Sequence, residues 1–409
     1  MPHPVFIMTS LGPIFADDLA RVKPGDRLRL TISAQTSDAA ALAQAALEAR
    51  ARGERVLVVC ADPADVPRLA QEMPWFEPKL DVRPLPDWET LPYDVLSPQE
   101  ELVSERLEAL YRLTAPTGGA DVLLTSAVTA SQRLSPVSYI GANTFFFHQG
   151  EQISLTTLQK RLAAAGYANV KQVLAAGEFA VRGSIVDVFP MGSERPFRLD
   201  FFDDEIESIR WFDVDTQRSM ESAEEIRLLP GHEFPVDPEA LLAFRQRWRR
   251  EFAGDPKKSI VYCDIEKEIL PPGIEYYLPL FFDETAALTD YLPPNARVFL
   301  LGDIEAALQA FGRDMASRYK VLAADPQRPA LAPERIWLKP EEFFKSLANF
   351  ARFTVEEKEN AEDLKRLTGI EVDRKSQNPV GKLLERTRES AMKGVRTLIA
   401  APSAGRMET

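Results

Sequence analysis

Several residue types that mark metal or redox chemistry are scarce in this sequence. Two cysteines and three histidines occur among 409 residues, and they are scattered along the chain. Because zinc sites and disulfide frameworks need grouped ligands, we expect neither, which fits a reducing compartment. Cys60 and Cys263 each end an apolar run, so we expect both thiols to be buried in strands.

Excess positive charge and long apolar runs are missing too. The formal net charge is -13, whereas a free-standing binder of duplex DNA usually has a basic surface. No apolar run approaches the length of a membrane-spanning helix, and the first residues lack the basic region of a signal peptide. We therefore expect a soluble, cytoplasmic protein. One basic stretch, Phe244–Arg250, leaves open a DNA-binding alternative to its interpretation as a solvated helix face.

Alternating strands and helices organise the first part of the chain. Arg27–Ile32 and Arg55–Ala61 have the composition of strands, and the second is the nearly continuous apolar run of a strand covered on both faces. The alanine-rich Ala39–Arg52 lies between them and Asp65–Met73 follows them, and both have helical patterns. This order predicts a doubly wound α/β domain.

The loop between the first strand and the first helix lacks a phosphate-binding motif. A P-loop needs glycines, whose backbone N–H groups surround phosphate, and a lysine that reaches the outer phosphates. Ser33–Asp38 contains neither glycine nor lysine, and Asp38 would repel phosphate, so we expect no nucleotide cofactor here. Gly381-Lys382 only opens a helical pattern, and the acidic run Asp203–Glu205 sits in a hairpin turn rather than in a magnesium motif.

A proline- and aromatic-rich segment, Leu85–Leu96, precedes the next helix. Its prolines favour an ordered loop, and we expect Trp88 and Tyr93 to anchor that loop on the domain. Ser97–Leu113 then has the N-cap, the early proline and the acidic first turn of a helix. Asp121–Thr125 has the composition of a further buried strand, so the α/β pattern continues.

From about residue 145 the pattern changes to strands separated by short turns. Phe145–His148 is a predicted strand and Leu155–Ala165 a predicted helix. Three more strands are predicted at Phe179–Phe189, Phe197–Phe202 and Glu205–Phe212, joined by a Pro-Met-Gly-Ser turn and by Asp203-Asp204. This spacing predicts an antiparallel α+β domain inserted into the first domain.

One face of these strands combines charge with an aromatic ring. Strand alternation separates two faces. The apolar face of the middle strand holds Phe197, Leu199 and Phe201, and the other face holds Arg198, Asp200 and Phe202. In the preceding strand, Arg182 is predicted to share its face with Ser184 and Val186.

Two interpretations of this charged face stay open. Two arginines beside a phenylalanine are typical of an interface hot spot, which uses planar guanidinium groups and a rigid ring. Alternatively, each arginine pairs with an acidic neighbour, such as Asp187, Asp200 or Glu207, and Phe202 packs under another segment.

After Pro230 the chain becomes helical again before a last set of α/β signals. Pro238–Phe252 is a predicted amphipathic helix, and Pro272–Phe282 is aromatic and typical of a core. Arg297–Leu301 is a predicted strand, followed by a helix from Asp303 to about Tyr319, a proline-rich bridge over Asp325–Pro340, and a short helix and a strand over residues 341–353. Val380–Lys393 is a predicted helix and Arg396–Ala400 a predicted strand without a successor, so we expect a truncated piece of a longer protein.

Four motifs resemble those of bacterial DNA-repair proteins. They are LPDWETLPYDVLSPQ at 85–99, the long stretch GEFAVRGSIVDVFPMGSERPFRLDFFDDEIESIRWFDVDTQRS at 177–219, LLPGHEFP at 228–235 and LPPGIEYYLPLFF at 270–282. The second resembles the interaction domain of the excision-repair protein UvrB. Residues 25–409 as a whole resemble the N-terminal part of the transcription-repair coupling factors more closely.

The resemblance implies a domain organisation. Residues 1–143 and 231–350 would form two lobes of a degenerate helicase-like α/β domain, the second with its proline-rich bridge. Residues 144–230 would be an inserted UvrA-binding domain, and residues 351–409 the start of a further α/β domain. UvrB-like proteins insert a DNA-probing hairpin after their Tyr-Asp motif, but only ten residues separate Tyr93-Asp94 from Glu105 here, too few for that hairpin.

The resemblance also implies a function and a site. Arg182, Arg198 and Phe202 match the residues that contact UvrA in this family, and we expect both arginines to meet carboxylates and Phe202 to fill a pocket. The chain would then recruit UvrA without catalysis. The family's ATP, magnesium, RNA polymerase and duplex DNA would belong to C-terminal domains that this sequence does not contain. The alternative is an ATP-dependent DNA helicase like UvrB.

Overall fold

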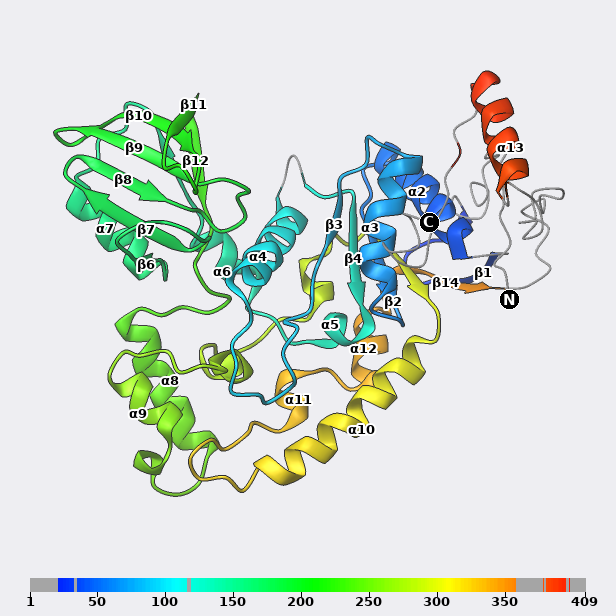
Figure 1. Cartoon of the computed structure of the whole chain (residues 1–409). Helices are drawn as coiled ribbons and strands as arrows, with labels where there is room; N and C mark the ends of the chain where they lie inside the picture. Colours follow the sequence, from blue (N-terminus) through cyan, green and yellow to red (C-terminus); the bar gives the residue numbers. More distant parts are fainter. Residues whose placement is uncertain are drawn as a thin grey trace.

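A six-stranded parallel sheet forms the centre of the α/β body (Figure 1). The computed structural model describes residues 21–32, 35–115, 119–357 and 380–394, with the single positions 378 and 397. The strand order is β1-β14-β13-β2-β4-β3. Its strands are β1 (Arg27–Ile32), β2 (Val56–Cys60), β3 (Val82–Pro84), β4 (Val122–Ser126), β13 (Arg297–Leu301) and β14 (Ala351–Glu357).

Helices cover both faces of this sheet, which is why its central strands are apolar throughout. Val58 and Leu124 face the core formed with α2 and α3, whereas Leu57 and Leu123 face the core formed with α4, α5, α10 and α12. The helices are α2 (Gln35–Ala51), α3 (Asp65–Phe76), α4 (Glu100–Thr114), α5 (Ala127–Ser131), α10 (Ile304–Leu322) and α12 (Pro340–Ser346). The predicted α/β class is confirmed.

Two predictions about the order of elements need correction or comment. Helix α2 begins at Gln35, so four of the six residues of the predicted loop Ser33–Asp38 are helical; positions 33 and 34 lie outside the described residues. Strand β14, which begins where a further domain was predicted, lies in the central sheet between β1 and β13. A boundary at residue 350 therefore cuts this sheet, and the domain division stays a prediction.

A helical, aromatic-rich region lies at one end of the body (Figure 1). It contains α8 (Pro238–Glu251), α9 (Ile260–Glu266), α11 (Pro333–Ile336) and short 3-10 turns at Pro256–Lys258 and Ile274–Leu280, whereas a third 3-10 turn, Leu288–Tyr291, packs in the core of the central sheet with α4. Trp88 is buried in its core, and the Tyr93 hydroxyl donates to the Leu331 carbonyl at 3.0 Å, so both anchor their loop as predicted. Cys60 is buried in β2, but Cys263 lies partly exposed in α9 rather than in a strand.

The elements from β5 to β12 lie in the chain between β4 and β13 of the central sheet, and we call them the insert. The insert follows α6 (Val137–Ala142) and is built on a second, six-stranded sheet (Figure 1). Its order is β11-β10-β9-β8-β7-β6, antiparallel except between β6 and β7. The elements are β5 (Phe145–His148), α7 (Leu155–Ala164), β6 (Ala168–Asn169), β7 (Glu178–Arg182), β8 (Ile185–Val188), β9 (Phe197–Phe202), β10 (Glu205–Phe212), β11 (Ser219–Ala223) and β12 (Glu225–Leu228). The predicted antiparallel α+β pattern is confirmed.

The predicted strand Phe179–Phe189 is in fact two strands, β7 and β8, which form a hairpin. The chain reverses at Gly183, whose φ of 62° lies in the left-handed region that glycine adopts without strain. The link is the two residues Gly183-Ser184, and the apolar residues Val181 and Ile185 on either side of Arg182-Gly183-Ser184 led to the prediction of one continuous strand. This correction changes which residues share a face.

Three further observations complete the fold. α13 (Gly381–Met392) confirms the predicted helix near the end of the chain, while the predicted strand Arg396–Ala400 lies outside the described residues apart from position 397. Within the part of the chain that the structure describes, none of the helices combines the length and apolarity that crossing a bilayer needs.

Candidate partner-binding face and the cavity at the sheet edge

The register of β7 to β10 arranges one face of the second sheet in rows, because directly opposed residues of neighbouring strands project to the same side. One row contains Ala180, Asp187, Arg198 and Arg210. The next row, nearer the β9–β10 turn, contains Arg182, Ile185, Asp200 and Ser208. Phe202 and Glu205 form the last row, beside the turn. We call this surface the row face.

The row face differs from the predicted face around Arg182. Arg182 lies opposite Ile185 across the hairpin, and Val186 is fully buried on the other side of the sheet. The predicted grouping of Arg182 with Val186 is therefore wrong, because it assumed one continuous strand through Gly183. The turn brings Asp187 to the side of Arg182 instead.

Asp187 is the buried centre of the row face. It is fully buried, and it accepts hydrogen bonds from Arg198 Nε at 2.7 Å and Arg198 Nη2 at 3.0 Å. Arg182 Nη2 donates to the same carboxylate. The structure thus realises the predicted alternative in which the arginines pair with an acidic neighbour. A buried carboxylate of this kind needs such partners, because an uncompensated buried charge is strongly destabilising.

The two arginines differ in how much of their bonding capacity faces outward. The third nitrogen of Arg198, Nη1, donates to the Gln217 carbonyl and to Ser219 Oγ, each at 3.2 Å, and the side chain is 15% exposed. Its hydrogen bonds to Asp187 raise the pKa of Arg198. The Arg182 side chain is 49% exposed. Arg198 therefore supports the face from within, whereas Arg182 presents a guanidinium to solvent.

Phe202 is the most exposed large apolar residue of the insert, at 69%. This exposure favours the interpretation of Phe202 as an uncovered side chain, because none of the segments that the structure describes covers most of its ring. Its neighbours Phe197, Leu199 and Phe201 are buried on the opposite face, as strand alternation predicted. An exposed ring and a half-exposed arginine on one face, here two strands apart, are typical of a protein-binding surface; the contact roles of Arg182, Arg198 and Phe202 themselves stay predictions.

Arg210 is a member of the row face that the sequence analysis did not identify. It lies directly opposite Arg198 across the β9–β10 hairpin, and it is exposed. Alternation within Glu205–Phe212 could have placed it on a face. Only the register shift between Ile206 and Ser208, which the sequence does not announce, shows which face that is.

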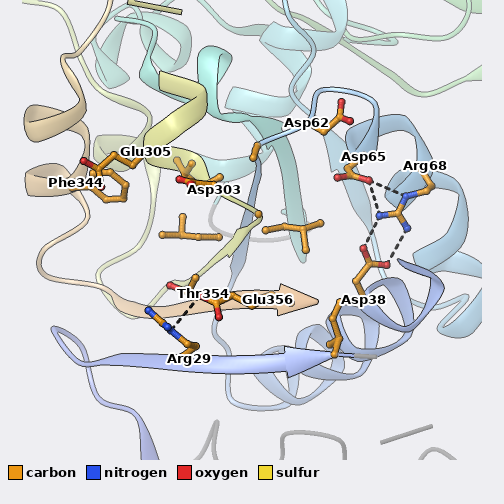
Figure 2. A pocket seen from close by; sticks show the side chains of 17 residues that line it. Arg29, Asp38, Asp62, Asp65, Arg68, Asp303, Glu305, Phe344, Thr354 and Glu356 are labelled. Atoms are coloured by element: carbon orange, nitrogen blue, oxygen red, sulfur yellow. Dashed lines mark hydrogen bonds and ion pairs between the residues drawn. The ribbon is translucent and has the colours of Figure 1, made fainter. Parts of the chain in front are cut away.

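The α/β body has a cavity of about 590 Å³ at the carboxyl ends of β1, β2, β13 and β14 (Figure 2). Ligands of open parallel sheets bind at this edge. Two arginines, Arg29 and Arg68, contribute to its lining, together with six carboxylates, which are Asp38, Asp62, Asp65, Asp303, Glu305 and Glu356. The cavity is therefore acidic, which disfavours phosphate.

Both arginines of the cavity are engaged by carboxylates. Asp38, which is 3% exposed, accepts from Arg68 Nη1 at 2.9 Å and from Nη2 at 2.6 Å. Asp65 and Glu72 also bind this guanidinium, at 2.8 and 3.0 Å. Arg29 pairs with Glu356 at 3.2 Å. Figure 2 shows Asp38 and Asp65 directed toward Arg68. Burial lowers the pKa of Arg68, but its hydrogen bonds outweigh this effect and raise the pKa.

The sequence analysis also expected no phosphate site, magnesium motif or metal site, and the structure locates some of the residues concerned. Gly381 is the first residue of α13, and Asp203–Glu205 forms the β9–β10 turn, as predicted. Among the residues with described positions, no group of histidine, cysteine or carboxylate side chains has the arrangement of a metal site. The side chains of residues 33–37 lie outside the description, so the loss of the phosphate loop stays a prediction.

A buried junction joins the insert to the body. The Glu233 carboxylate accepts hydrogen bonds from Arg106 Nε at 2.7 Å and from Trp88 Nε1 at 3.0 Å. His232 beside it lies under Gly166, where a Cβ atom would come within 2.8 Å of the imidazole. Burial lowers the pKa of His232 to about 4. The exit of the insert is thus held by a charge pair that removing either partner would disrupt.

Comparison with known proteins places these surfaces in a family context. Residues 145–234 match the model of the UvrB interaction domain. The chain is 42% identical over 73% of its length to the transcription-repair-coupling factor of Escherichia coli K12, covering 26% of that protein. It is 44% identical to that of Haemophilus influenzae over 67% of this chain and 24% of the relative. It is 32% identical to that of Bacillus subtilis over 49% of this chain and 18% of the relative. The chain thus spans about a quarter or less of these relatives.

Proposed function

Because the chain contains a UvrB interaction domain and belongs with the transcription-repair-coupling factors, we propose that its row face binds UvrA and so recruits excision repair to stalled transcription. The observation that carries this proposal is the 69% exposure of Phe202 on the same face of the sheet as the half-exposed Arg182. Both residues lie within the matched 145–234. A large exposed ring next to a guanidinium is energetically useful mainly when a partner covers it.

The three side chains have distinct roles in this proposal. Phe202 enters a pocket on UvrA, and Arg182 meets a UvrA carboxylate with the nitrogens that Asp187 leaves available. Arg198 was expected to meet a carboxylate of UvrA as well. Its nitrogens already donate to Asp187, Gln217 and Ser219, so we propose that Arg198 chiefly holds Asp187 and the β8–β9 pairing in place.

The α/β body serves in this proposal as a frame of helicase-like lobes that does not bind nucleotide. The acidic lining of its cavity and the three carboxylates on Arg68 support that view. ATP hydrolysis with magnesium, contact with RNA polymerase and movement along duplex DNA are proposed for the remainder of the longer relatives, since this chain spans only about a quarter of them.

The alternatives are less well supported by the structure. A UvrB-like helicase needs a phosphate site, which the cavity does not favour. DNA binding through α8 needs free arginines, but Arg247 pairs with Asp283 at 2.6 Å and Arg249 donates to the Tyr262 hydroxyl at 2.5 Å. Partner contacts of this kind inside the chain favour the interpretation as a solvated helix.

The decisive experiment is titration of purified UvrA with the purified chain. We expect saturable binding that Phe202→Ala weakens. The matched control is Phe146→Ala, since Phe146 is another exposed aromatic residue of the insert, on β5 in a different sheet. Absence of binding by a folded wild-type chain would contradict the proposal, and so would equal losses for the two phenylalanine variants.

A further inference from the structure

We infer that the UvrA surface facing this chain is bipolar, with basic side chains around the pocket for Phe202 and an acidic group opposite Arg182. This inference rests on the proposed function and adds the chemistry of the partner to it. Its basis is an asymmetry of the row face, whose exposed arginines and exposed carboxylates lie at different positions along the strands.

The turn end of the row face is rich in carboxylates. Asp203 and Asp204 form the turn after Phe202, and Glu205 lies directly opposite Phe202. Glu207 follows on β10, and all four carboxylates are exposed. Glu205 accepts a hydrogen bond from Gln152 at 2.7 Å. Among the described residues, no arginine, lysine or histidine forms an ion pair with Asp203, Asp204 or Glu207.

The cations of the same face do not neutralise this end. Arg198 and Arg210 lie two rows from Phe202, and Arg182 lies one row away. Arg198 and Arg182 both donate to Asp187. Asp200, in the row between, accepts from Ser208 Oγ at 2.9 Å rather than from an arginine. Phe202 is therefore surrounded on its turn side by uncompensated negative charge.

A partner that covers Phe202 must also cover this charge. Bringing like charges together across an interface costs several kilocalories per mole, whereas complementary potentials speed association and fix the orientation of the partners. A pocket edged with lysine or arginine satisfies the turn, and a carboxylate on the other side satisfies Arg182. The same charge disfavours nucleic acid as the occupant, because phosphates would be repelled.

The backbone of the turn offers a variant that separates binding from folding. Asp203 has a φ of 52°, a left-handed conformation in which glycine is relaxed and aspartate is strained. Asp203→Gly therefore removes a carboxylate while easing the turn. Asp204→Asn removes the second charge with little change in shape.

The test compares UvrA affinities at low and at moderate ionic strength. We expect the double variant Asp203→Gly/Asp204→Asn to bind about three- to thirtyfold more weakly at low salt, with a shallower salt dependence, since rim charges act mainly on association rate and salt response. It should melt no lower than the wild type. The control is Asp215→Asn, which removes an exposed carboxylate beyond the far end of β10.

Each outcome decides something. If the wild type binds and Phe202→Ala weakens binding, but the double variant equals the wild type at both salt concentrations, the carboxylates are only a solvated turn and the inference is wrong. Tighter binding by the double variant would show an acidic partner surface and overturn the inference as well. If the folded wild type does not bind UvrA at all, the proposed function fails first and the inference falls with it.

Discussion

The cavity of the α/β body and the row face of the insert use the same ion-pair chemistry in opposite proportions. At the cavity, three carboxylates surround the single guanidinium of Arg68: Asp38 and Asp65, which line the cavity, and Glu72, which lies outside its lining. On the row face, two guanidinium groups share the single carboxylate of Asp187. The first arrangement leaves negative charge unbalanced and the second leaves positive charge.

This difference shows that the same type of ion pair can leave an arginine unavailable to a ligand in one place and available to a partner in another. Arg68 is 24% exposed and is fully engaged, so it has little to offer an anion entering the cavity. Arg182 is 49% exposed and shares its carboxylate with Arg198, so part of its bonding capacity remains available. Whether an arginine supports its own fold or can bind a partner depends on how many of its donor groups are already engaged and on how exposed its side chain is, which residue type alone does not reveal.

The largest expected effect concerns the shared carboxylate. We expect Asp187→Asn to lower the free energy of unfolding by about 3–5 kcal/mol, because it removes the buried charge that both arginines share and leaves Arg198 without its bidentate partner. Asp38→Asn should cost less, since Arg68 keeps Asp65 and Glu72. Urea unfolding followed by circular dichroism measures both. Equal losses of stability in Asp187→Asn and Asp38→Asn would show that the number of carboxylates around each arginine does not affect the cost of removing one.

The next effect concerns binding at the open face. We expect Phe202→Ala to weaken UvrA binding by about 2–4 kcal/mol, the range of an anchor residue, while the melting temperature changes little because the ring is 69% exposed. Calorimetric titration gives the affinity. A variant that melts earlier but binds normally would assign Phe202 to the fold rather than to the interface.

The junction between the two regions should respond to acid. The pKa of His232 in the folded protein is about 4, below the ordinary value of 6.5. As the pH is lowered, His232 therefore takes up a proton at a lower pH in the folded protein than in the unfolded chain. Stability is therefore complete above about pH 6.5 and falls as the pH drops toward about 4, by up to about 3 kcal/mol. Urea titrations across this range measure the loss.

The matched variants for this acid response are His232→Phe and His148→Gln. The first removes the titrating group at the junction and should flatten the slope below pH 6.5. The second removes an exposed histidine of the insert and should keep it. An unchanged slope in His232→Phe would place the acid sensitivity elsewhere in the chain.

A smaller effect separates the two arginines of the row face. We expect Arg182→Ala to weaken UvrA binding by about 1–3 kcal/mol with little loss of stability. Arg198→Ala should mainly destabilise the insert, because it removes the bidentate partner of Asp187. Binding and thermal unfolding are measured on both variants. If Arg198→Ala folds as stably as the wild type and loses more affinity than Arg182→Ala, these assignments are reversed.

The smallest expected effect is at the cavity. We expect equilibrium binding of labelled ATP to show no affinity in the micromolar range, since the guanidinium of Arg68 is occupied by carboxylates. The measurement uses the full chain with magnesium present. Micromolar affinity for ATP would support the helicase alternative and would contradict the view that the cavity cannot bind an anion.

Much of the fold could be predicted because strand alternation and apolar runs report local burial. The central strands β2, β4 and β13, the helix α7 and the alternation of β9 follow from pattern alone. The hairpin at Gly183 was missed although its two-residue link, Gly183-Ser184, is a hairpin signal, because the apolar pattern was followed across the link. Cys263 shows a different limit, since a short apolar run fits a strand and a buried helix equally.

The candidate site was predictable in its residue types and not in its contacts. Arg182, Arg198 and Phe202 stand out by composition and by resemblance. That Asp187 serves both arginines depends on the register of three strands, and that Phe202 is uncovered depends on where distant segments lie. Both are non-local facts, which no local pattern encodes.

The pairing of β5 with β12 has a mechanical consequence. The chain enters the insert along one strand and leaves along the other, and Phe145 and Leu228 are direct partners at the end nearer the body. A load applied to the insert by a bound protein pulls both strands in the same direction, so their hydrogen bonds are not sheared against each other. The two strands share the tension with direct contacts to α4, such as the ion pair of Arg227 with Glu108, and the ion pair of Arg106 with Glu233 secures the chain after the exit strand.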